Sequence, residues 1–208
     1  MKQVAINAPA DQSKIKALVL IVGGAQDDAF VSDSATWLVD AQYATLTIEG
    51  ADEMRPEQLA QAFNEVAGNN GYPLPQALLA FGSTGPLAWE SLALDSGSIE
   101  SAFLVSSPLP KGDFDFERLR ETSIRAIFTE GGGVYESSYE RAHVPMRDIP
   151  TPHDFLVFGG GVVDNYYDRA SASFHQATWD ATLKSMSEWF DIWAAGGSGA
   201  GSSHPHAA

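Results

Sequence analysis

Short apolar runs bounded by glycine or polar residues recur along the first two thirds of the chain. Residues 17–22 are apolar without a break, and Gly23 and Gly24 follow directly. Such a run is typical of a strand that is buried on both faces, as in a parallel sheet. Further strands are expected at residues 43–48, 77–81, 102–106, 124–129 and 144–149.

Apolar residues at helical spacing separate these expected strands. One helix is predicted from Pro56 to about Gly68, because proline favours the first turn of a helix and glycine its end. Others are expected after Asp33, as a helix cap, and after Pro86. The last helix carries a wide apolar stripe that consists of Trp179, Leu183, Met186, Phe190 and Trp193. This alternation predicts an α/β fold with a doubly wound, mainly parallel sheet.

The length and composition predict one globular domain. The chain has 208 residues, of which 44% are hydrophobic and 19% charged, and this is enough to bury one ordinary core. We expect a single domain over residues 1–195. Residues 196–208 are glycine, serine, alanine, proline and histidine, so they are predicted to form a flexible tail, and His204 and His206 are not considered as ligands.

Charge and cysteine content exclude several classes of function. With 27 acidic and 12 basic residues, the formal net charge of −15 repels nucleic acid and anionic membrane surfaces. The chain has no cysteine, which excludes thiolate chemistry and disulfides. Residues 1–16 lack the apolar stretch of a signal peptide, and no run is long enough to span a membrane. A cytoplasmic protein that acts on a small molecule is therefore expected.

A candidate nucleophile lies where the apolar run 77–81 meets a glycine-rich turn. The sequence from Phe81 to Gly85 is Phe-Gly-Ser-Thr-Gly, and a strand that leads through such a turn into a helix is typical of a nucleophile elbow. Ser83 is then the candidate nucleophile. Gly85 is as small as this turn requires, but Phe81 is not. The alternative is an ordinary turn in which Ser83 or Thr84 caps the following helix.

The other groups needed for acyl transfer follow in the expected order. Elbow hydrolases place an acid and then a histidine after the nucleophile, and Glu130 and His153 occur in that order, each next to a predicted strand. We predict that His153 is the base and that Glu130 orients it. His143 and His175 are expected to be structural or exposed.

Backbone amides of Thr84 and Ala25 are the predicted oxyanion hole, since Gly23 and Gly24 allow the first loop to approach closely. The glycine triplets 131–133 and 159–161 lack the spacing of phosphate-binding loops and are interpreted as turns. The sequence has no metal-binding motif, so neither a metal nor a cofactor is expected.

Residues 17–49 resemble the first central strand and helix of the dienelactone hydrolase family. The similar residues are Ala-Phe at 29–30, Ala-Thr-Trp-Leu-Val-Asp at 35–40 and Tyr-Ala at 43–44. The resemblance continues through the turn at Ser83 and the His-Asp-Phe sequence 153–155 to the last helix. It implies an α/β-hydrolase fold and hydrolysis of lactones, esters or thioesters by a Ser or Cys, His and acid triad, without a cofactor.

Departures from the family leave a second interpretation open. An alignment on Phe81 places Gly82 at the nucleophile position, and Gly132 falls where the family has its aspartate. The alternative to a serine hydrolase is thus a pseudoenzyme that keeps the fold as a ligand-binding or protein-binding module, or a purely structural subunit, with a homodimer as a further possibility. Because no arginine closely follows His153, a catalytic form is expected to prefer neutral over dianionic acyl substrates.

Overall fold

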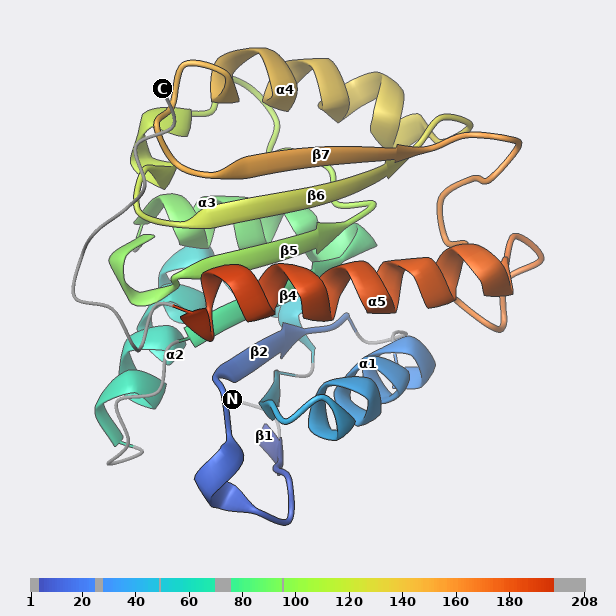
Figure 1. Ribbon diagram of the computed structural model, residues 1–208. Helices are drawn as coiled ribbons and strands as arrows, with labels where there is room; N and C mark the ends of the chain where they lie inside the picture. Colours follow the sequence, from blue (N-terminus) through green and yellow to red (C-terminus); the bar gives the residue numbers. More distant parts are fainter. Residues whose placement is uncertain (1–3, 25–27, 49, 70–75, 95, 197–208) are drawn as a thin grey trace.

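The described residues, 4–24, 28–48, 50–69, 76–94 and 96–196 of a computed structural model, contain one seven-stranded sheet. The strand order is β1-β3-β2-β4-β5-β6-β7, and every neighbouring pair is parallel except the antiparallel pair of β1 and β3 (Figure 1). The strands are β1 Val4–Asn7, β2 Leu18–Val22, β3 Ala44–Ile48, β4 Gln76–Phe81, β5 Ser101–Val105, β6 Ser123–Thr129 and β7 His153–Phe158.

Helices cover both faces of this sheet. Helices α1 (Asp28–Asp40) and α5 (Gln176–Trp193) pack on one face, while α2 (Pro56–Asn69), α3 (Gly85–Leu94) and α4 (Glu140–Met146) pack on the other (Figure 1). Successive side chains along a strand point to opposite faces of the sheet. In β2, Leu20 belongs to the core under α2 and α3, and Val19 belongs to the core under α1 and α5. A strand buried on both faces is mainly apolar, which explains the unbroken run that β2 shows in the sequence.

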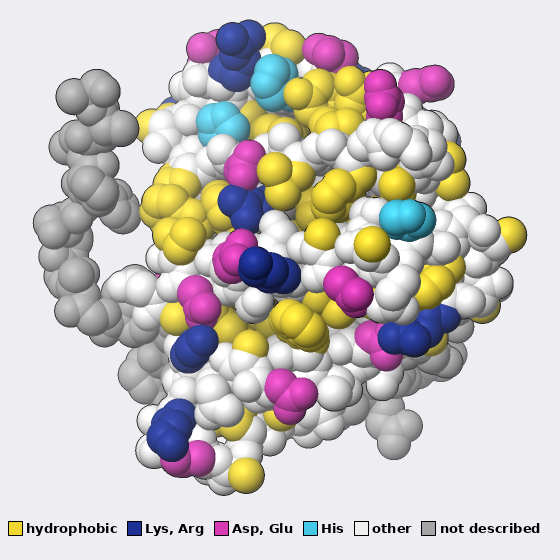
Figure 2. Space-filling view, turned by 45° about the vertical axis from the view of Figure 1, so that its right-hand side comes forward, with side chains coloured by type: hydrophobic (Ala, Val, Ile, Leu, Met, Phe, Trp, Pro, Cys, Tyr) yellow, Lys and Arg dark blue, Asp and Glu magenta, His cyan; other side chains and the backbone are white. Residues whose placement is uncertain are grey.

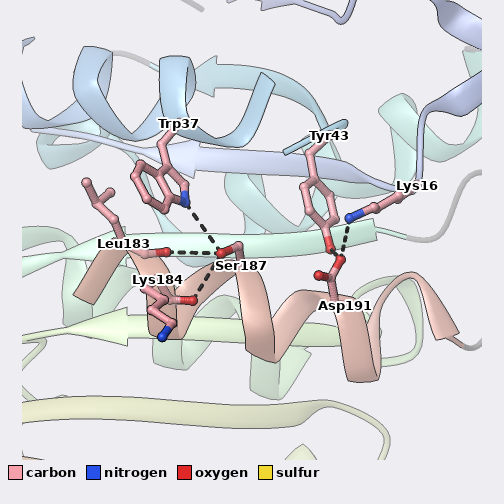
Figure 3. Close-up of polar contacts among 7 residues, drawn as sticks. All are labelled: Lys16, Trp37, Tyr43, Leu183, Lys184, Ser187 and Asp191. Carbon is pink, nitrogen blue, oxygen red and sulfur yellow. Dashed lines mark hydrogen bonds and ion pairs between the residues drawn. The ribbon is translucent and has the colours of Figure 1, made fainter. Parts of the chain in front are cut away.

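Polar contacts fix α5 on its own face of the sheet (Figure 3). The hydroxyl of Tyr43 donates to Asp191 Oδ1 at 2.6 Å, and Lys16 Nζ forms an ion pair with the same oxygen at 2.7 Å. Burial, together with the hydrogen bond to Asp191, raises the pKa of the Tyr43 phenol far above its usual value. Nearby, Trp37 Nε1 donates to Ser187 Oγ at 3.4 Å. These contacts join the last helix to α1 and to the residues that closely precede β2 and β3.

The predicted fold class is confirmed, but one strand was assigned to the wrong residues. Residues 144–149 belong to the end of α4 and the turn after it, not to a strand. Ser138, Ala142 and Met146 are buried at intervals of four residues, which is a helical period that the sequence interpretation overlooked. The strand at this point in the chain is β7, which begins at His153.

Smaller differences concern the ends of elements. Asp33 lies inside α1, so it does not cap that helix. Strand β1 was not predicted. The predicted tail lies outside the described residues from position 197 onward. No helix in the described part of the chain is long and apolar enough to cross a membrane.

Candidate active site

The strand order reverses its direction at β2, which lies between β3 and β4. Ligands of open α/β sheets bind beyond the carboxyl ends of the strands at such a switch point. Gly23 and Gly24 follow β2 here, and the turn Gly82–Thr84 follows β4. Of the predicted oxyanion residues, Thr84 lies at this edge, whereas Ala25 lies outside the described residues.

A threonine side chain in the turn after β4 links the ends of β4 and β2. Thr84 is buried, and its Oγ1 lies 2.8 Å from Phe81 O and 3.2 Å from Val22 O, so the hydroxyl donates to carbonyl groups at the ends of β4 and β2. Ser83, the predicted nucleophile, is exposed in the same turn. The predicted role of the Thr84 amide in an oxyanion hole stays a prediction.

Gly82 has the backbone conformation of this turn that favours glycine, with φ of +40°. A Cβ atom at this residue would lie 2.6 Å from the hydroxyl oxygen of Tyr167, well inside van der Waals contact. The Tyr167 side chain is itself buried, and its hydroxyl donates to Asn165 Oδ1 at 3.3 Å. The space in which a side chain at position 82 would stand is therefore filled by Tyr167.

Aromatic rings pack around this point. The ring of Phe30, from α1, lies 4.8 Å from that of Phe81 and 4.7 Å from that of Tyr167, measured between centroids. Trp179 of α5 lies 6.2 Å from Phe81 and 6.3 Å from Tyr167. All four side chains are buried. The protein's own aromatic residues thus occupy the region between α1, α5 and the end of β4.

A second glycine, Gly132, faces a carboxylate in the same way. A Cβ atom at Gly132 would overlap the carboxylate of Asp164, which belongs to the loop between β7 and α5. Asp164 Oδ1 accepts a hydrogen bond from Thr129 Oγ1 at 2.8 Å, and its Oδ2 accepts one from the Val134 amide at 3.2 Å. A carboxylate therefore stands beside position 132, but it comes from a residue 32 positions further along the chain.

Glu130, the predicted acid, follows β6 at the same edge of the sheet. Its amide donates to Phe158 O at 2.9 Å, and its side chain is exposed beside Gly159. Strands β4 and β6 are separated by β5, which places the ends of β4 and β6 about 10 Å apart at the usual strand spacing. Glu130 consequently lies toward β7 and away from the turn that holds Ser83.

His153, the predicted base, lies at the opposite edge. It is the first residue of β7 and pairs with Ile124 near the start of β6, so about 16 Å of strand separates it from the carboxyl edge. Its Nδ1 lies 2.9 Å from Thr151 O. The structure does not bring Ser83 and His153 together. The predicted strand at residues 144–149 placed His153 in the loop before the last helix, whereas His153 in fact begins the last strand, β7.

The loop that does lead from the last strand into α5 covers residues 159–175. It contributes Asp164 and Tyr167 to the site, and neither was predicted. The signal that could have found this loop is the apolar sequence 153–158 followed by the second glycine triplet, which together indicate a strand and a turn. His175, at the end of the loop, accepts from the Thr178 amide and caps α5, as expected for a structural histidine.

Comparisons with known proteins place this geometry in context. No protein family matches the sequence, and no curated protein matches it. Among solved structures, a Klebsiella pneumoniae protein assigned to the dienelactone hydrolases superposes with a TM-score of 0.72 at 11% identity, covering 92% of this chain and 100% of the other. The dienelactone hydrolase from Anabaena variabilis gives 0.66 at 15%, covering 92% and 91%. The chain has the α/β-hydrolase fold.

A third similar structure is Est1E from Butyrivibrio proteoclasticus, with a TM-score of 0.64, 12% identity and coverage of 90% and 94%. In the α/β-hydrolase fold, the turn after the central strand carries the nucleophile and the loop before the last helix carries the base. In this chain, the same turn contains Gly82 and Ser83, and the same loop contains Asp164, Tyr167 and His175. Within the described residues, no group of three or more histidine, aspartate or glutamate side chains could hold a metal ion.

Proposed function

We propose that this chain is a non-hydrolytic binding module built on the α/β-hydrolase fold. The observation that carries the proposal is the contact at the elbow: the Tyr167 hydroxyl lies where a side chain on Gly82 would begin. Nucleophilic catalysis needs a hydroxyl or thiol at this point, with a base in hydrogen-bond reach. A glycine supplies neither the nucleophile nor the space for one.

The second glycine supports the same proposal. At Gly132, the neighbouring space holds the carboxylate of Asp164, which accepts hydrogen bonds from a buried threonine and from a backbone amide. These two accepted bonds tie the loop 159–175 to the end of β6 and to the helical segment that follows it, so we infer that Asp164 has a structural task. The loop that provides the base in a hydrolase serves in this chain to close the site.

A serine hydrolase of small esters, lactones or thioesters is the competing function. It is favoured by the exposure of Ser83 in the elbow turn, and esterases and dienelactone hydrolases are among the structures with the same fold. Against it, His153 lies at the far edge of the sheet, and Nδ1 of His175 is engaged in capping α5. If this function were nevertheless present, neutral acyl substrates would be preferred.

Labelling with a fluorophosphonate probe tests the proposal. We expect no labelling of the folded protein above the level of a heat-denatured sample, and no hydrolysis of a neutral aryl ester above that of the Ser83→Ala variant. Stoichiometric labelling that is lost in Ser83→Ala would overturn the proposal and establish the serine hydrolase. A carboxylated ester of similar size, assayed in parallel, would then test the preference for neutral substrates.

A further inference from the structure

A shallow groove runs along the helices that cover the other face of the sheet. Two adjoining hollows, of about 520 and 470 Å³, share Glu57 and Leu94 in their walls. One hollow follows the exposed side of α2 as far as Glu65, and the other continues over the end of α3 to Phe114. The part along α2 is about 12 Å long, at 1.5 Å for each helical residue. We call these two hollows together the α2–α3 groove.

The floor of the α2–α3 groove has apolar side chains that pack on α3. Leu94, at the end of α3, is 48% exposed, although it is one of the larger aliphatic residues. Beside it, Phe114 packs against Trp89 of α3, with ring centroids 6.1 Å apart. Ser91 Oγ donates to Pro56 O at 3.1 Å and so joins α3 to the start of α2. Apolar side chains in a groove between two helices can receive the apolar face of a partner helix.

The rim of the groove is acidic. Glu57, Glu90 and Asp113 line it, and none of the three forms an ion pair within the described part of the chain. Of the two lining arginines, Arg118 is paired with Asp115 at 3.2 Å. Arg55 is the other lining arginine, and the groove carries five acidic side chains against two basic ones, which leaves a net negative charge around its apolar centre.

The face formed by α1 and α5 is different. There, acidic side chains lie beside basic ones (Figure 2). Asp33 pairs with Arg169 at 2.8 Å, and Asp191 pairs with Lys16 at 2.7 Å. On that face these two acidic side chains are neutralised by ion pairs, whereas Glu57, Glu90 and Asp113 of the groove form none in the described part of the chain.

We propose that the α2–α3 groove binds a basic amphipathic helix of a partner protein. This inference rests on the proposed binding function and names the class of partner. Leu94 and Phe114 would receive one or two aliphatic side chains, while lysine or arginine residues on either side would face Glu57, Glu90 and Asp113. A helix fits because it satisfies its own backbone hydrogen bonds, and the walls of the groove are helices that offer no free strand edge.

The test uses a 14-residue helical peptide of leucine and lysine as the probe, titrated into the full chain at 50 mM salt. We expect saturable binding that weakens as salt is raised, whereas a leucine and glutamate peptide of the same length does not bind. The Leu94→Ser variant should raise the Kd about tenfold, since one leucine side chain loses its burial. Ile192→Ser is the matched control, because Ile192 is 58% exposed on α5, and it should change the Kd less than twofold.

Charge variants separate a docking site from general attraction. Glu57→Gln with Glu90→Gln should raise the Kd at least about fivefold, while Glu136→Gln with Glu140→Gln, which changes the net charge equally on exposed residues near α4, should change it less than twofold. Equal effects of the two pairs, no effect of Leu94→Ser, or no binding at all would overturn the proposal. Fluorophosphonate labelling reports on Ser83 and the peptide titration on the groove, so the two proposals can fail separately.

Discussion

The carboxyl edge of the sheet and the α2–α3 groove differ in whether their side chains have partners within the chain. At the carboxyl edge, each of two glycines faces a side chain from the same loop, and the Asp164 carboxylate is held by Thr129 and by a backbone amide. In the groove, carboxylates without ion pairs in the described structure surround the exposed Leu94. The first region is completed by the chain itself, and the second is left to be completed by another molecule.

This difference separates what the fold allows from what the residues of this chain support. The fold places a catalytic centre at the carboxyl edge in many α/β hydrolases, but position in a fold does not by itself determine activity. Groups whose hydrogen bonds are made and whose space is filled cannot bind a substrate without first being displaced. A partner gains free energy of binding where it can pair with an unpaired charge or cover exposed apolar area.

The largest expected effect is that of Gly82→Ala. The added methyl group meets Tyr167, and alanine must adopt the left-handed backbone conformation of this position. We therefore expect a loss of about 2–4 kcal/mol in the free energy of unfolding. Gly112→Ala is the control, because Gly112 also has a positive φ but nothing within 4 Å, and it should cost only about 1 kcal/mol. Urea unfolding measures both.

The same experiment has a second arm. Adding Tyr167→Phe to Gly82→Ala removes the hydroxyl from the contact, so the double variant should cost less than the sum of the single ones. Equal stability losses in Gly82→Ala and Gly112→Ala would show that the space at the elbow is free, and the contrast between the two regions would then disappear.

Asp164→Ala should be the next largest change. It removes two accepted hydrogen bonds and leaves the buried Thr129 hydroxyl without this acceptor, which should cost about 1–3 kcal/mol. Asp168→Ala, in the same loop and with the same change in charge, removes one exposed contact to the Ala170 amide and should cost under about 1 kcal/mol. In the Asp164→Ala background, Gly132→Ala should become nearly harmless. If the stability losses of Gly132→Ala and Asp164→Ala were additive, this would argue against a direct contact between the two positions.

Alkaline pH should loosen the closed region. Burial raises the pKa of the Tyr166 phenol well above its usual value of about 10. Above pH 10 the unfolded chain loses this proton while the folded protein keeps it, so stability falls as pH rises, by at most about 1.4 kcal/mol per pH unit for this group. Tyr166→Phe should flatten the decline, and Thr182 keeps its bond to Thr178 O in that variant. An unchanged slope would contradict the assignment.

The smallest effect is expected in the groove. Leu94→Ala should change stability by less than about 0.5 kcal/mol, because the side chain is half exposed. The fully buried Leu92, on the same helix, is the contrast: Leu92→Ala should cost about 2–5 kcal/mol. A large loss in Leu94→Ala would mean that the groove floor is part of the core and not a surface kept for a partner.

The sequence was most informative where burial alone decides the structure. Mostly apolar runs identified strands β2 to β6, because residues buried on both faces of a sheet are mainly apolar. It was least informative at the edge of the sheet. The strand β7 is half-exposed and contains a histidine and an aspartate, whereas the apolar spacing of α4 was read as a strand.

The candidate site followed from that error and from a limit of single sequences. Ser83 and Gly82 were placed correctly in a turn after a buried strand, because this signal is local. The pairing of Gly82 with Tyr167, and of Gly132 with Asp164, joins residues far apart in the chain. Nothing in the spacing of one sequence indicates which side chain will fill the space that a glycine leaves.

One feature of the carboxyl edge bears on how such a protein can change over time. A serine introduced at position 82 would meet Tyr167 before it could meet a substrate, and an aspartate at position 132 would meet Asp164. Each substitution is therefore harmful until the loop has also changed, and the loop residues lose contacts if they change first. The two glycines and their partners in the loop thus form two pairs of mutually dependent positions, and a side chain becomes tolerable at either glycine only after its partner has changed.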